Sequence, residues 1–331
     1  MLITAMILGG LVLLFFGGES LVNGAVAVAR KLGISPLLIG LVLVGFGTST
    51  PELITSVIAA MNDTPGLALG NVLGSNIANI LLILGATAVI VPLVCQKAAF
   101  KKDGMFMLVA TLMALGVCLY GTLSRPIGIV FLVALAGYII YSIWLEKHNE
   151  TGSADLEHAD LDPEEGDVAE VTIPGFRGTL FFSVLQFIFG LVLTFLGAKI
   201  LVKGSVELAQ NFGVSDTIIG LTIVAIGTSL PELVASLMAA FKKQADIAYG
   251  NIIGSNIYNI LGILGVTAVL HPFQIDPDIA RIDIWIMLAA TLGLLFASFT
   301  RWTIVRWEGA VFLLGYVAYI ASLIWRASHV A

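Results

Sequence analysis

The sequence predicts an all-α polytopic membrane protein with ten transmembrane helices, arranged as two inverted five-helix repeats that contain broken helices. Of the 331 residues, 58% are hydrophobic and 11% are charged, and the mean hydropathy of +1.01 lies far outside the range of a water-soluble domain. The apolar residues form ten runs, each long enough to cross a bilayer. Two stretches, which begin at Gly40 and at Gly220, also repeat each other without a gap. These three observations together define the fold class.

The ten apolar runs are separated by short polar breaks and by one long polar segment. The first five are expected near residues 2–29, 37–61, 67–92, 104–122 and 126–145. The second five are expected near residues 179–209, 217–241, 246–270, 282–299 and 303–325. The first run has neither a basic leading segment nor a small-residue cleavage site, which is typical of a retained span and not of a signal peptide.

The long polar segment divides the chain into a first repeat at 1–145, an acidic linker at 146–177 and a second repeat at 178–331. Ten of the 22 acidic residues lie between Glu146 and Glu170, so the net charge of −6 describes the linker and not the membrane body. Such a segment buries too little apolar surface to fold alone. It lacks the glycine and the closing glutamate of an EF-hand loop, which disfavours a regulatory calcium site there.

Basic residues fall mainly on one side of the ten-span scheme, the side that carries the linker. The residues on this side are Arg30, Lys31, Lys97, Lys101, Lys102, Lys147, Arg177, Lys242, Lys243, Arg301 and Arg306. Only Arg125, Arg281 and Arg326 emerge on the other side. Because basic loops stay in the cytoplasm, we expect a cytoplasmic linker and both termini outside.

The internal repeat is long and free of gaps. Residues 40–85 read GLVLVGFGTSTPELITSVIAAMNDTPGLALGNVLGSNIANILLILG, and residues 220–265 read GLTIVAIGTSLPELVASLMAAFKKQADIAYGNIIGSNIYNILGILG. They are identical at 25 of 46 positions. Since each copy carries five spans, an odd number, the second must enter the bilayer from the opposite side. Inverted repeats of this kind are typical of secondary transporters, which bind their substrate near the midplane between the repeats.

Each copy places a helix break and a carboxylate in the middle of an apolar run. The glycine of GTS-x-PE loosens the helix, and the proline removes a backbone donor, which should free carbonyl oxygens just before the break. The carboxylate follows in the first turn of the next helix, where the helix dipole favours an anion. Carbonyl, hydroxyl and carboxylate oxygens suit sodium or calcium better than zinc or copper. The residues concerned are Gly47, Pro51 and Glu52, copied as Gly227, Pro231 and Glu232.

A polar stripe follows in the next run of each copy. Asn71, Ser75 and Asn79 are spaced four apart, and their copies are Asn251, Ser255 and Asn259. This spacing places each set on one face of a helix, within expected reach of the glutamate. Gly70 with Gly74, and Gly250 with Gly254, form a small-residue face on which we expect a neighbouring backbone to approach closely.

Each feature has a simpler explanation when it is taken alone. Polar residues in membrane helices often serve only as hydrogen-bonding contacts between helices, and a Gly-Pro break is often only a kink. The duplication argues against this explanation, because two carboxylates recur with no Lys or Arg in either GTS-x-PE segment. Such groups are costly in a bilayer and need a charge partner. Glu19 is expected to have a structural role, paired with Lys199, which is its equivalent in the second copy when the alignment of the repeats is extended.

Both repeated stretches resemble the alpha-repeats of the calcium/cation antiporter superfamily, and the whole layout is similar to the prokaryotic sodium/calcium exchanger branch. The resemblance implies that calcium is held by Glu52, Glu232 and the backbone oxygens of Thr48 and Thr228. It implies an outward sodium site and an inward one, with Asn79 and Asn259 lining the centre between them. The outward site would use Ala225, Thr228, Glu232 and Ser255, and the inward site Gly45, Thr48, Glu52 and Ser75. The adjacent Ser49 and Ser229 are further candidates.

The resemblance also implies a mechanism and a location. Two carboxylates are neutralised by one calcium ion or two sodium ions, so mutually exclusive occupancy predicts exchange by alternating access, with the first and sixth spans as the moving part. Some relatives carry Asp at a central position, and the two Asn residues here disfavour potassium coupling. We expect a multi-pass protein of a prokaryotic plasma (inner) membrane. Its partners would be calcium, sodium and the lipid bilayer, with no cofactor, nucleic acid or obligatory protein partner.

Three alternatives stay open at this point. A proton-coupled calcium antiporter would use the same fold and the same two glutamates. A cation channel is a weaker alternative, because a closed and charge-balanced site fits exchange better. An intramembrane enzyme using Ser49 or Ser229 is disfavoured, since all four histidines lie outside the repeated stretches and no base stands near either serine. Cys95 and Cys118 stand alone in apolar surroundings, which predicts buried thiols and no disulfide.

Overall fold

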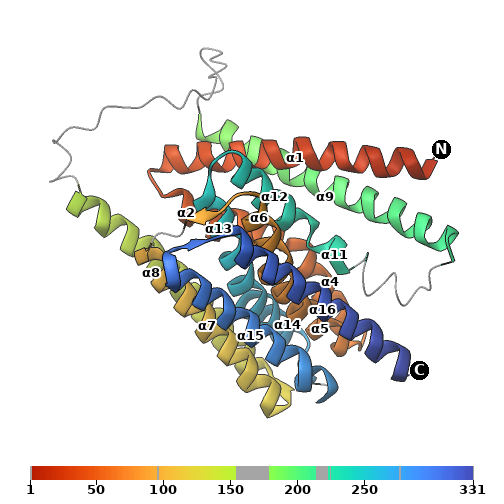
Figure 1. Ribbon diagram of the computed structural model, residues 1–331. Helices are drawn as coiled ribbons and strands as arrows, with labels where there is room; N and C mark the ends of the chain where they lie inside the picture. Colours follow the sequence, from red (N-terminus) through yellow and green to blue (C-terminus); the bar gives the residue numbers. More distant parts are fainter. Residues whose placement is uncertain are drawn as a thin grey trace.

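The protein is a bundle of long helices with two very short sheets, and its computed structural model describes residues 2–94, 97–153, 179–213, 223, 225–275 and 277–330 (Figure 1). The elements before the linker are α1 (Leu2–Leu32), α2 (Pro36–Ile39), η1 (Gly40–Val44), α3 (Gly45–Thr48), α4 (Thr50–Met61), α5 (Pro65–Ala78), η2 (Asn79–Leu84), α6 (Gly85–Ile90), β1 (Leu93–Val94), α7 (Lys97–Tyr120), β2 (Thr122–Leu123) and α8 (Arg125–Ser153). Those after it are α9 (Leu180–Asn211), α11 (Ala225–Thr228), α12 (Leu230–Phe241), α13 (Ala245–Ile257), η4 (Tyr258–Ile263), α14 (Leu264–Leu270), β3 (Phe273–Gln274), α15 (Pro277–Arg301), β4 (Thr303–Ile304) and α16 (Arg306–Val330). The η elements are short π-helical segments.

The described helices account for most of the expected membrane spans. Eight of them are long and apolar enough to cross a bilayer, and the unit from Pro36 to Met61, bent by 43°, would be a ninth. The run expected at 217–241 is represented by α12, which has only 12 residues, while residues 214–222 and 224 lie outside the described part. The described residues therefore give eight or nine spans where ten were predicted.

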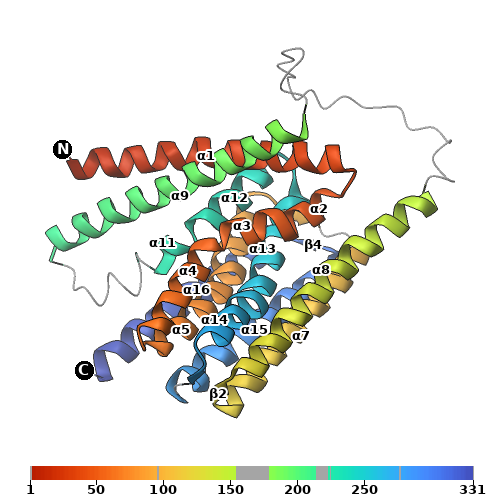
Figure 2. The same cartoon turned by 180° about the vertical axis from the view of Figure 1, so that it is seen from behind.

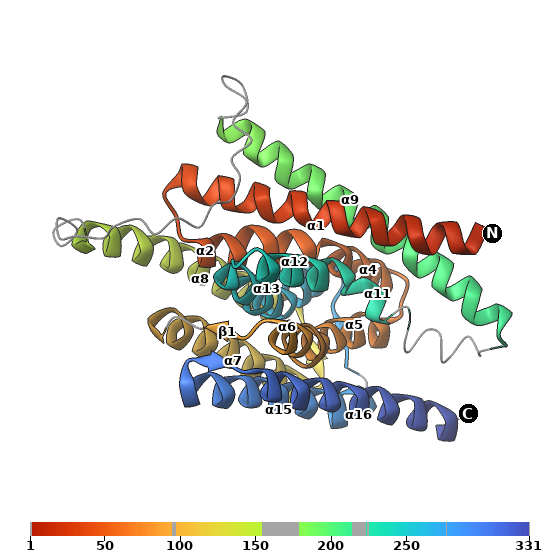
Figure 3. The same cartoon turned by 45° about the horizontal axis from the view of Figure 1, so that its top comes forward.

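Helices α1 and α9 form a closely packed pair along one face of the molecule (Figure 2). Glycines spaced by seven line the contact: Gly10, Gly17 and Gly24 on α1, and Gly190, Gly197 and Gly204 on α9. A Cβ atom added to Gly17 would lie 2.6 Å from the backbone nitrogen of Thr194, so the two backbones touch where no side chain intervenes. Figure 3 shows this pair on one side of α12 and α13, with α15 and α16 on the opposite side.

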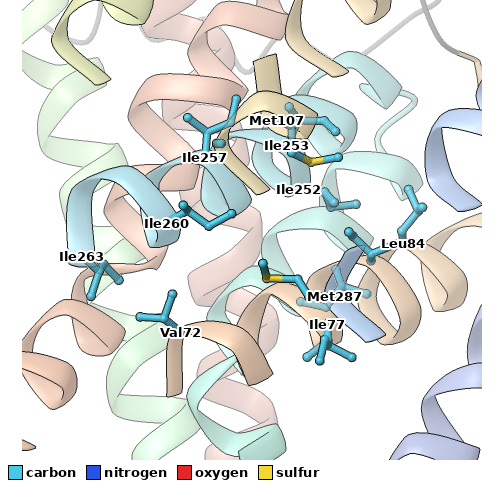
Figure 4. Close-up of a cluster of buried hydrophobic side chains, with 14 of the residues drawn as sticks. Val72, Ile77, Leu84, Met107, Ile252, Ile253, Ile257, Ile260, Ile263 and Met287 are labelled. Carbon is cyan, nitrogen blue, oxygen red and sulfur yellow. The ribbon is translucent and has the colours of Figure 1, made fainter. Parts of the chain in front are cut away.

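The remaining helices of the two halves interlock. Strand β1 pairs with β4, and β2 pairs with β3, so each sheet joins one half of the chain to the other. Helix α8 packs on α14, and α6 packs on α16. Buried side chains of both halves form one apolar core, which includes Val72 and Ile77 of α5 and Ile252 and Ile257 of α13 (Figure 4). This core holds the polar helices α5 and α13 in fixed positions.

The structure refines the predicted boundary of the linker. Helix α8 continues to Ser153, past the expected end of the fifth span, because no proline interrupts it. Cys95 and residues 154–178 of the linker lie outside the described residues. Cys118 is a buried free thiol, as predicted. In all three views the two chain ends lie at one end of the bundle, and the ends of α8 and α9 that border the linker lie at the other.

Candidate ion-binding site

Both predicted helix breaks are present. Helix α3 ends at Thr48 and α4 begins at Thr50, with Ser49 between them at φ −83° and ψ 8°. In the second half Ser229 takes nearly the same conformation, φ −90° and ψ 7°, between α11 and α12. Proline occupies the start of each following helix, and Glu52 or Glu232 sits in its first turn. The local sequence therefore produces the same backbone feature twice.

The two glutamates lie deep inside the bundle. Glu52 is 1% exposed, and neither of its carboxylate oxygens has a hydrogen-bond partner within the described part of the chain. Glu232 is 2% exposed, and its Oε1 accepts a hydrogen bond of 2.9 Å from the hydroxyl of Ser49, while Oε2 has no such partner there. Burying a carboxylate without a partner is costly. Three orphaned carboxylate oxygens are what a cation would satisfy.

Candidate ligand groups of one repeat contact residues at the helix break of the other. Thr48 donates through Oγ1 to Oδ1 of Asn251 at 3.3 Å, and Ser255 donates through Oγ to the carbonyl of Gly45 at 3.2 Å. Helix α13 lies against η1 and α3, and α5 lies against α11. The expected small-residue face explains the close approach of α13, because a Cβ on Gly250 would lie 2.5 Å from the carbonyl oxygen of Leu37.

This arrangement differs from the expected grouping of Ser255. The resemblance placed Ser255 with Ala225 and Thr228 of its own repeat, whereas its hydroxyl contacts Gly45 of the other repeat. The carbonyl of Gly45 is also less free than expected, since it accepts the backbone N–H of Ser49 at 3.2 Å. A carbonyl has two lone pairs, so the backbone bond leaves room for a second contact.

The close approach is seen for only one copy of the small-residue face. Gly70 and Gly74 of α5 have no neighbouring atom within 4 Å of an added Cβ among the described residues. By the alignment of the two repeats, the segment that would lie against them falls in residues 214–224, most of which are outside that part.

Two asparagines fix the glutamate-bearing helices in place. Asn71 donates to the backbone carbonyl of Glu52 at 3.1 Å and to the hydroxyl of Ser56 at 2.9 Å. Asn251 repeats both bonds, to Glu232 at 3.2 Å and to Ser236 at 2.9 Å. Ser56 and Ser236 were missed in the sequence. They could have been predicted from the sequence, because each serine lies one helical turn after its glutamate and the two serines are at equivalent positions of the two repeats.

The central asparagines lie where the helices change their winding. Asn79 is the first residue of η2, and Asn259 is the second residue of η4. Both are 1% exposed, and no described residue makes a hydrogen bond to either side-chain amide. Single π-helical turns inside α-helices occur frequently at functional sites. Their amide oxygens are therefore available to a ligand.

The remaining predicted residues lie on the same elements. Ser75 of α5 is buried, and Thr228 ends α11 in a half-buried position. Ser229 is buried, with no partner for its hydroxyl among the described residues. Ala225 is the first residue of α11. Carboxylate, hydroxyl, amide and carbonyl oxygens are thus supplied from both halves, a donor set suited to hard cations.

The expected pairing of Glu19 with Lys199 is wrong. Glu19 of α1 instead forms an ion pair with Lys242, at the end of α12, with an Oε1–Nζ distance of 3.1 Å. The reason is that α1 meets α9 through its glycine stripe, and Glu19 is not on that stripe.

Comparison with known proteins gives a consistent result. The family model described as "Sodium/calcium exchanger protein" matches residues 2–144 and 182–325. The chain is 39% identical to "Putative antiporter CaxA" of Alkalimonas amylolytica, covering 96% of this chain and 97% of that protein. It is 33% identical to "Sodium/calcium exchanger MaX1" of Methanosarcina acetivorans, covering 95% and 96%. A solved structure of the sodium-calcium exchanger NCX_Mj, soaked with sodium and calcium, superposes with a TM-score of 0.79 at 31% identity, covering 98% of this chain and 99% of that one.

Proposed function

This chain belongs to the sodium/calcium exchanger family, a family of transporters, and we propose that it exchanges sodium for calcium across a prokaryotic inner membrane. Family membership and the structural match support cation/calcium antiport. The observation that carries the proposal is the pair of buried glutamates, Glu52 and Glu232, which lie at two helix breaks and have three carboxylate oxygens without a partner among the described residues.

In this proposal calcium binds between Glu52 and Glu232, with the backbone oxygens of Thr48 and Thr228. The contacts across the repeats favour a regrouping of the sodium ligands. The Gly45 carbonyl and Thr48 would act with Ser255, which already touches that carbonyl. Ala225 and Thr228 would act with Ser75, since α5 lies against α11. Asn79, Asn259, Ser49 and Ser229 complete the polar lining.

Charge balance gives the exchange rule. Glu52 and Glu232 carry two negative charges, which one calcium ion or two sodium ions neutralise. An empty site would carry a net charge through the low-dielectric part of the membrane, which is costly. The protein would therefore switch the side of the membrane to which the site is exposed only when ions occupy the site. Because each switch then carries ions, transport in one direction is coupled to transport in the other, which is exchange. The moving part would be the α1–α9 pair, which packs as one unit.

We propose ten spans in two inverted repeats, at 1–145 and 178–331, with both termini outside and the linker in the cytoplasm. Two observations support this topology. Both chain ends lie at the end of the bundle opposite to the linker ends of α8 and α9. The reciprocal pairing of β1 with β4 and of β2 with β3 is what a twofold relation between the halves would produce.

The test is calcium uptake into proteoliposomes that are loaded with sodium and diluted into sodium-free medium. We expect uptake to follow the sodium gradient and to be abolished in Glu52→Gln. The matched control is Asp63→Asn, which removes an exposed carboxylate from the loop after α4, where Asn tolerates the positive φ of 54°. Full activity in Glu52→Gln would contradict the proposed site.

A proton-coupled calcium antiporter is the second candidate, because the same two carboxylates can carry protons instead of sodium. The same vesicles distinguish the two candidates when a pH gradient replaces the sodium gradient. Uptake driven by protons alone would keep the fold and the site and change the coupling ion.

A further inference from the structure

Helix α1 is docked on α12 through a glycine and an ion pair. A Cβ added to Gly18 would lie 2.5 Å from Cγ1 of Val234 and 2.9 Å from Cγ of Met238, so the backbone of α1 lies directly against these side chains of α12. One residue further, Glu19 forms its ion pair with Lys242. Helix α12 begins at the break that carries Glu232. The contact therefore covers the helix whose first turn carries Glu232.

The equivalent face in the first half is uncovered. In the alignment of the repeats, Val234 and Met238 match Ile54 and Ile58 of α4, and both isoleucines are more than half exposed. The residues that match Glu19 and Lys242 are Lys199 of α9 and Asn62, which are also exposed. Among the described residues, the α1–α9 pair thus rests on the glutamate-bearing helix of the second half and leaves this face of α4 exposed.

We propose that Glu19 and Lys242 are positioning residues that hold the α1–α9 pair on α12 and set the balance between the two exposed states of the transporter. The inference rests on the proposed exchange by alternating exposure of one site. In the opposite state the pair would rest on α4, where Lys199 takes the place of Glu19 and the uncharged Asn62 takes the place of Lys242, so the equivalent of this ion pair is absent. The ion pair therefore stabilises only the state seen here, in which α12 is covered and α4 is bare.

The glycines that join α1 to α9 are the same in both long helices and favour neither state, whereas the docking residues Gly18 and Glu19 of α1 are replaced by Ala198 and Lys199 in α9. A ligand or contact changes an equilibrium only if it differs between the two states. The Glu19–Lys242 pair meets this condition. Part-exposed ion pairs stabilise modestly, so we expect the ratio of the two states to change by about two- to fivefold when the pair is removed.

The test measures the two populations directly by electron-resonance distances between spin labels. Labels are placed at Phe16→Cys on α1 and Met61→Cys on α4, two exposed sites, in a full-length background with Cys95→Ala and Cys118→Ala. We expect two distances, one of them matching the structure. Glu19→Gln or Lys242→Gln should reduce the share of that distance, and the exchanged pair Glu19→Lys with Lys242→Glu should restore it.

Lys199→Gln is the matched control, because it removes a charge from the equivalent position of α9 and should leave both populations unchanged. Equal effects of Lys199→Gln and Glu19→Gln, or failure of the exchanged pair to restore the ratio, would overturn the inference. Calcium uptake is measured separately. If uptake is driven by sodium but the two populations do not respond to Glu19→Gln, the inference alone is rejected. If there is no uptake and only a single, unchanging distance is seen, the proposed function is rejected as well.

Discussion

The two halves of the proposed ion site have similar sequences but different surroundings. Glu232 accepts a hydrogen bond from Ser49 of the other half, whereas both oxygens of Glu52 are without a partner among the described residues. Asn251 is fully buried and accepts a hydrogen bond from Thr48, whereas Asn71 is only half-buried. The repeated motif therefore determines which polar groups are present at each break, and the neighbouring helices determine what each of these groups contacts.

The strongest test of the comparison is to neutralise each glutamate in turn. Glu52→Gln and Glu232→Gln should each reduce calcium uptake by more than about 100-fold, because a buried site that loses one of two charges cannot balance a divalent ion. Uptake in proteoliposomes measures this effect. A large loss in one variant with near-normal uptake in the other would show that the two halves are not equivalent in function.

The same two variants should differ in stability without ions. Glu52→Gln removes a buried charge that has no donor among the described residues, so its melting temperature in ion-free detergent should rise by several degrees. The melting temperature of Glu232→Gln should rise less, because the wild-type carboxylate already accepts a hydrogen bond from Ser49. Equal shifts in the two melting curves would argue against the asymmetry described here.

Removing the supporting asparagines should give a smaller effect that also differs between the halves. Asn251→Ala deletes three hydrogen bonds, one of them to the opposite repeat, and should weaken calcium uptake by about 10- to 100-fold at subsaturating calcium. Asn71→Ala deletes the hydrogen bonds to Glu52 and Ser56 and should reduce calcium uptake by less, since Asn71 is only half-buried. The concentration dependence of uptake measures both effects, and the reverse order would contradict the structure.

The serines at the two breaks should show a further difference. Ser49→Ala removes the donor that orients Glu232, and we expect about a tenfold weaker apparent calcium affinity, as for a hydrogen bond to a charged group. Ser229→Ala should change the affinity by less than about threefold, because its hydroxyl makes no such bond within the described residues. Calcium titration of uptake distinguishes them. Identical losses would show that Ser229 bonds an ion or a carboxylate in the working cycle.

An aromatic contact provides the mildest test. Phe46, beside Gly45, stacks on Tyr258, beside Asn259, with ring centroids 4.4 Å apart, and the equivalent positions of the other half carry Ile226 and Ala78. Phe46→Ile gives the first half the residue of the second and should cost about 0.5 to 1.5 kcal/mol of stability. Chemical denaturation in detergent checks this, with Ile58→Val on the exposed face of α4 as the control. No change in stability would mean that the stack contributes nothing.

Much of the fold was predictable because the membrane constrains the chain so strongly. Apolar runs of sufficient length must be helices, since every backbone polar group has to be satisfied inside the bilayer. The two helix breaks were predictable from Gly47 and Pro51 and from their copies. The positions of Glu52 and Glu232 in the first turn after each break followed from the order of the residues alone.

The partners of these groups were not predictable, because periodicity along one helix says nothing about which helix lies opposite. Glu19 and Lys199 occupy equivalent positions of the two repeats, yet Glu19 pairs with Lys242, since the glycine stripe of α1 turns that side chain toward α12. Ser56 and Ser236 became visible as supports only once Asn71 and Asn251 were seen to bridge them to the glutamates.

The order of the residues was enough to predict a duplicated, membrane-spanning helical chain with two broken helices, and it named candidate oxygen ligands beside each break. Helix packing decided which of these candidate groups contact one another: Ser255 contacts Gly45, Thr48 contacts Asn251, and Ser49 contacts Glu232. The physical reason is that α13 packs against η1 and α3 of the other repeat through Gly250 and Gly254. The proposed ion site therefore combines residues of both repeats and forms only where the two repeats meet.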